Sequence, residues 1–296
     1  MDIISMLTTS TSATRLSELQ TMIKTVAHQC YTFEFEPTVY HQLVQNYPSF
    51  AHFFDRFQQL HQSIWLHKEN YDINPYQDTA HKGVYLLSVQ DTDLGIFPYG
   101  DLVWKCSQGK LQGGNLRHQF YRSQVLISEF ATKLSAREQE MLQVCPVYLY
   151  MQSQREQDFC KQILVMPRVK GKTLGEIPTG FTAEFCQVFQ IPSLEEIQQR
   201  SRFRLHRWLD PHKQRQLLKI QTAYLFRHLW QKGIKILSLN QKNILLNSAS
   251  SSDDVRYTII DPVADYFAPI TPLYNLSTTA LSTGQKMKGV EKLICE

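Results

Sequence analysis

The chain has 296 residues, of which 43% are hydrophobic and 20% are charged, and its formal net charge is +4. This is the balance of an ordinary globular protein that is long enough to bury a sizeable core, in one two-lobed domain or one domain with a small extension. A charge this small does not by itself indicate a nucleic acid or a membrane as partner.

The six cysteines are scattered, with no Cys-x-x-Cys pair and no Cys/His cluster at the spacing of metal ligands. This pattern predicts reduced thiols in a cytoplasmic protein rather than a disulfide framework. No stretch approaches the roughly 18 apolar residues that span a bilayer, and the first residues do not resemble a signal peptide. We therefore expect a soluble cytoplasmic protein without a membrane span. A bacterial effector that is secreted into a host is the alternative.

The first part of the chain has helical periodicity. Leu16, Leu19, Ile23 and Val26 predict a helix over residues 15–30, and a second helix is expected after Pro37. A third helix is expected over residues 49–67, where one face is apolar: Phe50, Phe53, Phe54, Phe57, Leu60, Ile64 and Trp65. We interpret residues 1–75 as a helical N-terminal extension.

The period then changes. Strands are predicted over 84–89, 102–106, 147–151 and 162–169, with a helix over 116–134 between the second and third. Beyond Gly171 the chain is expected to be mainly helical, with its best helix over 211–232 and Gly233 in the position of a helix-terminating glycine. Two short late strands, 243–246 and 257–260, flank a polar loop. The order predicts an α+β fold, with a mostly-β part over 76–169 and a mostly-α part over 170–296.

The most informative stretch follows the long helix. The helix ends at Gly233, Ser238 and Asn243 are separated by four residues, Asn243 leads an apolar strand, and Asp261-Pro262 ends the next strand. This spacing resembles the catalytic loop and metal-binding segment of the protein-kinase-like superfamily. Among its branches it is similar to aminoglycoside phosphotransferases, fructosamine kinases and lipopolysaccharide kinases. The resemblance covers residues 80–265 and implies a two-lobed fold, with a small β-rich lobe and a larger α-rich lobe.

The resemblance also implies roles for single residues. Asn243 and Asp261 correspond to the ligands of Mg²⁺, a hard cation that prefers oxygen. Lys105 corresponds to the strand lysine that holds the phosphates of ATP, and its partner on the next helix would be Glu129, with Gln124 as the alternative. Backbone groups from Met166 to Arg168 would meet the adenine. Mg²⁺ and ATP are thus the expected ligands.

The sequence departs from this pattern at the catalytic position. Ser238 stands where the superfamily has its catalytic aspartate, and a neutral hydroxyl cannot accept a proton at neutral pH. Loss of a positioned general base costs roughly 10²–10⁴-fold in rate. The phosphate-binding loop before Val84 contains a single glycine, Gly83. No Ala-Pro-Glu element follows Asp261, which predicts a shortened large lobe.

Three functions are compatible with these residues. The first is a regulatory or scaffolding pseudokinase with a protein partner, which still holds Mg-ATP through Lys105, Asn243 and Asp261. The second is an active atypical phosphotransferase that acts on a small molecule, a lipid or a protein. The third is a protein-interaction module without nucleotide, in which the basic segment Arg200–Arg215 would meet an acidic partner. Each residue also has a plain structural interpretation: a turn asparagine, an aspartate before proline, a strand lysine and a solvated basic face.

Overall fold

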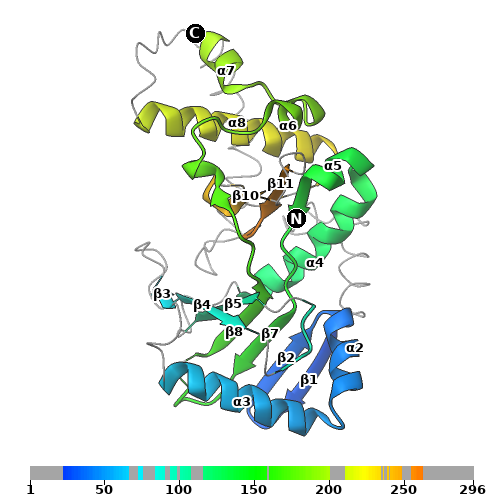
Figure 1. Ribbon diagram of the computed structural model, residues 1–296. Coiled ribbons are helices and arrows are strands. Elements are labelled where there is room, and N and C mark those ends of the chain that lie inside the picture. Colours follow the sequence, from blue (N-terminus) through cyan, green and yellow to red (C-terminus); the bar gives the residue numbers. More distant parts are fainter. Residues whose placement is uncertain are drawn as a thin grey trace, which may run out of the picture. The chain divides into compact units, whose positions relative to one another are not determined.

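The computed structural model describes residues 23–66, 73–75, 84–90, 94–98, 101–107, 116–158, 160–200, 211–234, 236, 239, 241–248 and 255–262. The chain divides into two compact units. Unit 1 comprises Met1–Val125 and Pro146–Arg168, and unit 2 comprises Leu126–Cys145 and Val169–Glu296. Each unit combines a sheet with helices, which confirms the predicted α+β class (Figure 1).

Unit 1 is built on an antiparallel seven-stranded sheet in the order β1-β2-β7-β8-β5-β4-β3. The strands are β1 Lys24–His28, β2 Tyr31–Phe35, β3 Ile73–Pro75, β4 Val84–Gln90, β5 Asp101–Ser107, β7 Leu149–Ser153 and β8 Gln162–Pro167. All four strands that the sequence predicts in this region are present, and each of their ends lies within two residues of the predicted one.

The N-terminal part of the sheet corrects the prediction. The helix expected over 15–30 is wrong in its described part, because β1 and β2 form a hairpin that turns at Gln29 with a φ of 51°. Tyr31, Phe33 and Phe35 alternate with a period of two and are all buried, as strand residues on one face of a sheet are. The described part of the supposed helical extension therefore contributes strands, as well as two helices, to unit 1.

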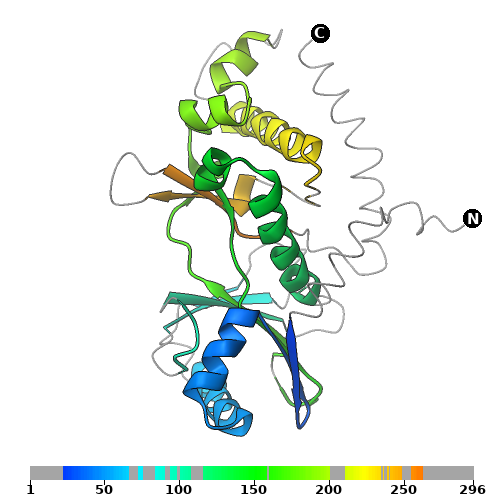
Figure 2. The same cartoon turned by 90° about the vertical axis from the view of Figure 1, so that its right-hand side faces the viewer.

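The other two N-terminal helices are confirmed as α2 Pro37–Asn46 and α3 Phe50–Leu66. α2 begins with proline at its first position, and the side chain of Glu36 accepts a hydrogen bond from the N–H of Val39 at 3.0 Å. Aromatic side chains of α3 pack on one face of the sheet, where Phe57 stacks on Trp104 with ring centroids 5.2 Å apart. Figure 2 shows both helices on the same side of the strands.

The two faces of β5 differ in character. Leu102, Trp104 and Cys106 belong to the aromatic core under α2 and α3. Since side chains alternate along a strand, Lys105 and Ser107 lie on the opposite face. Both are buried, Lys105 at 4% exposure. The second face of the sheet is therefore also covered at β5, where it carries polar side chains.

Helix α4, Leu116–Lys133, confirms the helix predicted over 116–134. The division between the two units falls within it, after Val125. Its first turns bring polar side chains to the second face of the sheet in unit 1. None of the helices in the described ranges has both the length and the apolar character needed to cross a bilayer.

Unit 2 contains a four-stranded sheet in the order β6-β11-β10-β9, in which β6 pairs parallel with β11. Its strands are β6 Leu142–Val144, β9 Lys172–Thr173, β10 Ile244–Ser248 and β11 Val255–Ile259. Its helices are α5 Ala136–Met141, α6 Ala183–Val188, α7 Leu194–Arg200 and α8 Pro211–Gln231, with single 3₁₀ turns η3 Leu174–Glu176 and η4 Gln241–Asn243. The predicted late hairpin and the long helix are both present, and Gly233 has the left-handed φ of 74° expected after a helix end.

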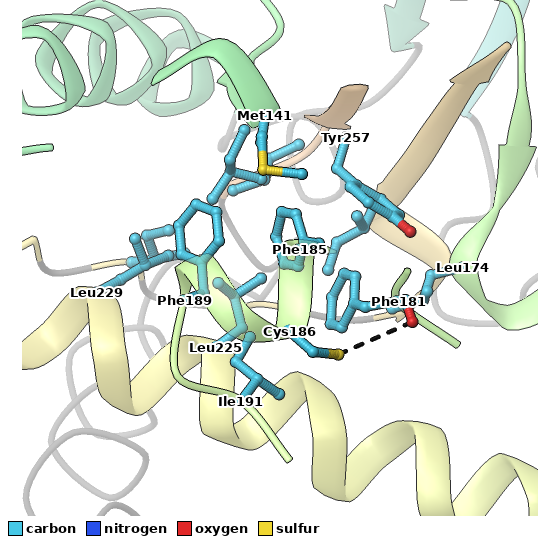
Figure 3. Close-up of a cluster of buried hydrophobic side chains, with 14 of the residues drawn as sticks. Met141, Leu174, Phe181, Phe185, Cys186, Phe189, Ile191, Leu225, Leu229 and Tyr257 are labelled. Atoms are coloured by element: carbon cyan, nitrogen blue, oxygen red, sulfur yellow. Dashed lines mark hydrogen bonds between the residues drawn. The ribbon is translucent and has the colours of Figure 1, made fainter. Parts of the chain in front are cut away.

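The core of unit 2 is aromatic where α6 meets the sheet and α8. Phe185 lies between Phe181, Phe189 and Tyr257, with ring centroids 4.3–4.5 Å away. Figure 3 shows these rings together with Leu225 and Leu229 of α8. The Tyr257 hydroxyl accepts a hydrogen bond from the N–H of Thr182 at 3.0 Å, so the buried phenol is satisfied at the start of α6.

One buried carboxylate joins α5 to α8. Glu138 forms a capping box with Ser135, whose N–H and hydroxyl both donate to Oε2 at 2.7 Å. The same carboxylate accepts from Nε2 of His228 at 2.7 Å and from Nζ of Lys232 at 2.6 Å. The last turn of α8 is thus tied to the first turn of α5 by one side chain that is 3% exposed.

Gly171 sits where the backbone before β9 passes close to β10. A Cβ at this position would lie 2.9 Å from the carbonyl carbon of Leu246 and closer still to its oxygen. We expect Gly171→Ala to lower the free energy of unfolding by about 1–3 kcal/mol, because backbone atoms must shift to admit the methyl group. Gly175→Ala is the matched control, since its nearest contact would be the side chain of Gln241 at 3.4 Å. Equal thermal midpoints for the two variants would contradict the close approach.

Candidate functional site

Asn243 and Asp261 lie beside each other at one end of the β10–β11 hairpin. Asn243 ends η4, and its Nδ2 donates to the backbone carbonyl of Asp261 at 3.2 Å. A backbone hydrogen bond joins the same two segments, because the N–H of Ile260 donates to the carbonyl of Asn243 at 2.9 Å. Asp261 follows β11 and is 9% exposed. The fold therefore brings together the two residues that the sequence suggested as metal ligands.

The donor set fits Mg²⁺. The hydrogen bond made by Nδ2 of Asn243 uses the amide nitrogen, so the amide oxygen and the Asp261 carboxylate are the groups with ligand chemistry. One carboxylate and one amide oxygen match the protein share of a magnesium site, since Mg²⁺ keeps several waters and takes further oxygens from phosphates. Within the described ranges, no three His, Cys, Asp or Glu residues converge in a way that could hold a metal by themselves.

Lys105 lies on β5 of unit 1, on the covered second face. Its Nζ donates to Oε1 of Gln119, a residue of α4 that is 1% exposed, at 3.1 Å. Ser107, also on β5, and Ser123, also on α4, are fully buried as well. Lys105 is therefore a buried lysine in contact with a neutral amide, and the interpretation as an exposed strand lysine is wrong.

Both residues expected as partners of Lys105 have contacts of their own. Glu129 lies in unit 2, where its Oε1 accepts from Nζ of Lys133 at 2.9 Å. Gln124 donates through Nε2 to the carbonyl of Val147 at 2.6 Å. Gln119, which the sequence analysis did not single out, accepts a hydrogen bond from Lys105. Nothing in the residue pattern distinguishes Gln119 from other polar residues of α4.

The stretch expected to meet an adenine continues the sheet. Met166 pairs with Val103 in the β5–β8 ladder, and the N–H of Arg168 donates to the carbonyl of Asp101 at 2.8 Å. Hydrogen-bonded positions recur every second residue along an antiparallel ladder, so the N–H of Met166 faces β5 as well. Pro167 has no N–H. The N–H groups of Met166 and Arg168 are thus used in hydrogen bonds to β5.

Two sequence predictions fall outside what the structure describes. Ser238 is not among the described residues, although Ile236 before it is 1% exposed and belongs to the unit 2 core. The basic segment Arg200–Arg215 is described only as the end of α7 and the start of α8, without its basic side chains. Both remain predictions.

Comparison with known proteins identifies no family. No protein-family model matches the chain, and no curated protein matches it. Among solved structures, the kinase domain of maize sucrose-induced receptor kinase 1, bound to AMP-PNP, aligns over 72% of this chain at 15% identity with a TM-score of 0.32. The alignment covers 59% of the kinase chain. A likeness this slight adds nothing to what the residues themselves indicate.

Proposed function

We propose that this protein is a kinase-like pseudokinase that binds Mg-ATP and serves a regulatory or scaffolding role without efficient phosphoryl transfer. The observation that carries the proposal is the hydrogen bond between Asn243 and the carbonyl of Asp261. Two residues 18 positions apart, separated by a polar loop, meet at the place that the motif spacing requires.

The buried Lys105 supports the phosphate-binding half of the proposal. A lysine that is 4% exposed and oriented by Gln119 is a positioned cation. Such cations neutralise phosphate charge in nucleotide sites. Adenine recognition would need carbonyl or apolar contacts, because the N–H groups of Met166 and Arg168 are used in the sheet.

The sequence is the basis for proposing a loss of catalysis. Ser238 replaces the carboxylate that accepts the acceptor's proton, and such a loss typically lowers the rate by about 10²–10⁴-fold. We therefore assign the site to binding. An acceptor assay on the same preparation separates this proposal from an active phosphotransferase, which would release or transfer phosphate at a rate well above that of water.

The test is a thermal-shift titration with ATP, with and without Mg²⁺. For the wild type we expect a Mg-dependent rise in the midpoint, since a ligand at about 100 times its Kd adds about 2.7 kcal/mol of stability. Asp261→Asn should remove the Mg-dependent part, because the neutral carboxamide lacks the negative charge with which the carboxylate holds the cation.

Asp55→Asn is the control, as Asp55 is an exposed aspartate on α3 of unit 1. It should leave the shift unchanged. A full shift in a folded Asp261→Asn variant would exclude the metal site. No shift in the wild type with any nucleotide would refute the proposal and favour a nucleotide-free interaction module.

A further inference from the structure

A straight cross-strand row runs over the covered face of the unit 1 sheet. Glu34 pairs with Tyr150, Tyr150 with Leu164, and Leu164 with Lys105. The row crosses β2, β7, β8 and β5, so its two charged ends are three strand spacings, or about 14 Å, apart. All four residues are buried, with Glu34 at 0% exposure.

The first turns of α4 reach both ends of this row. Arg117 donates through Nε to Oε1 of Glu34 at 2.8 Å, and its Nη2 contacts the same oxygen. Two residues later, Gln119 accepts from Lys105 at 3.1 Å. Residues two apart on a helix are related by a rotation of about 200° about its axis, so Arg117 and Gln119 extend from nearly opposite sides of α4. Leu116, Phe120 and Ser123, which lie between these two directions, are all buried.

The contact at Glu34 ties α4 to the sheet. Glu34 is fully buried, and Arg117, whose side chain is 55% exposed, supplies a compensating charge at Oε1. Removing one member of such a pair leaves a buried charge without compensation, which proteins tolerate poorly. The hydrogen bond that Arg117 donates to Glu34 also raises the pKa of the Arg117 guanidinium above its ordinary value, so the guanidinium stays charged.

We propose that the Glu34–Arg117 ion pair is a positioning device that sets the rotation of α4 over the sheet and thereby holds Gln119 against Lys105. Glu34 and Arg117 act only through Gln119 and Lys105. The consequence for nucleotide binding rests on the function proposed above. The orientation of Lys105 does not, and it can be measured by itself.

The first readout is the rate at which Lys105 is methylated by formaldehyde and cyanoborohydride, followed by peptide mass spectrometry. We expect the double variant Glu34→Gln/Arg117→Gln to react about tenfold faster at Lys105 than the wild type. Interaction energies between residues of one network commonly correspond to a factor of this size. The double variant leaves no unpaired charge behind, so it keeps the fold testable. Glu34→Gln alone should show a smaller increase in the same direction.

A second comparison tests whether the ion pair affects Lys105 by way of Gln119. Gln119→Met should itself speed the labelling of Lys105, and adding Glu34→Gln/Arg117→Gln to it should change the rate no further. The control is Arg137→Gln/Glu140→Gln, which removes an exposed ion pair on α5 and should leave Lys105 at the wild-type rate.

The outcomes separate the inference from the proposed function. An unchanged labelling rate in the folded double variant, additive effects with Gln119→Met, or equal acceleration in the control would each overturn the positioning role. If the wild type binds Mg-ATP, the double variant should weaken Kd about tenfold, and an unchanged Kd would overturn the link to binding. If the wild type binds no nucleotide, the proposed function fails, and the labelling rates still decide the inference.

Discussion

Replacing Glu138 by glutamine should lower the free energy of unfolding of unit 2 by about 3 kcal/mol. The carboxylate is 3% exposed and accepts from Ser135, His228 and Lys232 at once. An amide keeps the shape but loses the charge and presents two donors toward donors. The cost is moderated because Lys232 is 31% exposed and can be hydrated.

Hydrogen exchange is the appropriate measurement, because a chain with two units need not unfold in one step. We expect the largest loss of protection in the last turn of α8 and the first turn of α5. Glu140→Gln is the matched control two residues along: Glu140 is 60% exposed, and its pair with Arg137 contributes at most about 1 kcal/mol. Similar losses in both variants would contradict the role assigned to Glu138.

The same substitution has a defined pH dependence. Burial raises the pKa of the Glu138 carboxyl, but hydrogen bonds from Lys232 and Ser135 outweigh it and lower the pKa to about 2. Because the folded pKa lies below the unfolded value of 4.5, the stabilisation is present above pH 4.5 and is lost as the pH falls toward 2. The stability difference between wild type and Glu138→Gln should therefore shrink over this range. A constant difference would show that charge is not the cause.

Periodicity predicted the fold well where side chains repeat over a long element. The helices at 50–66 and 211–231 and the strands at 84–90, 101–107, 149–153, 162–167, 244–248 and 255–259 follow the apolar pattern, whereas the short strands at 142–144 and 172–173 were not predicted. The hairpin at 24–35 was missed because Ile23 and Val26 continue a helical spacing. The alternation of Tyr31, Phe33 and Phe35 becomes informative only once the turn at Gln29, which has a positive φ, is known.

The candidate site could be predicted in part for a similar reason. The positions of Asn243 and Asp261 are linked by a short hairpin, so motif spacing was enough to bring them together. The partner of Lys105 depends on how α4 is rotated over the sheet. That rotation involves Arg117 and Glu34, which are 83 residues apart, and local sequence carries no signal of such a contact. The same holds for Glu138, whose capping box is local while His228 is 90 residues away.

Truncating Phe185 to alanine should lower the free energy of unfolding of unit 2 by about 3–5 kcal/mol. The ring is fully buried and contacts Phe181, Phe189 and Tyr257 at centroid distances of 4.3–4.5 Å (Figure 3). Its removal takes away three aromatic contacts and leaves a cavity that short α6 cannot close without moving its own hydrogen bond to Tyr257. Thermal unfolding and hydrogen exchange of α6 and α8 measure the loss.

Phe226→Ala is the matched control, since it deletes the same ring from α8 of the same unit. Phe226 is only partly buried and stacks on Trp230 at a centroid distance of 5.9 Å. Partial exposure reduces both the transfer and the cavity cost, so we expect a clearly smaller loss than for Phe185→Ala. If Phe185→Ala cost no more than Phe226→Ala, the cluster around α6 would not be the centre of the unit 2 core. A loss confined to Phe185→Ala would instead establish that α6 is held in place by its aromatic contacts.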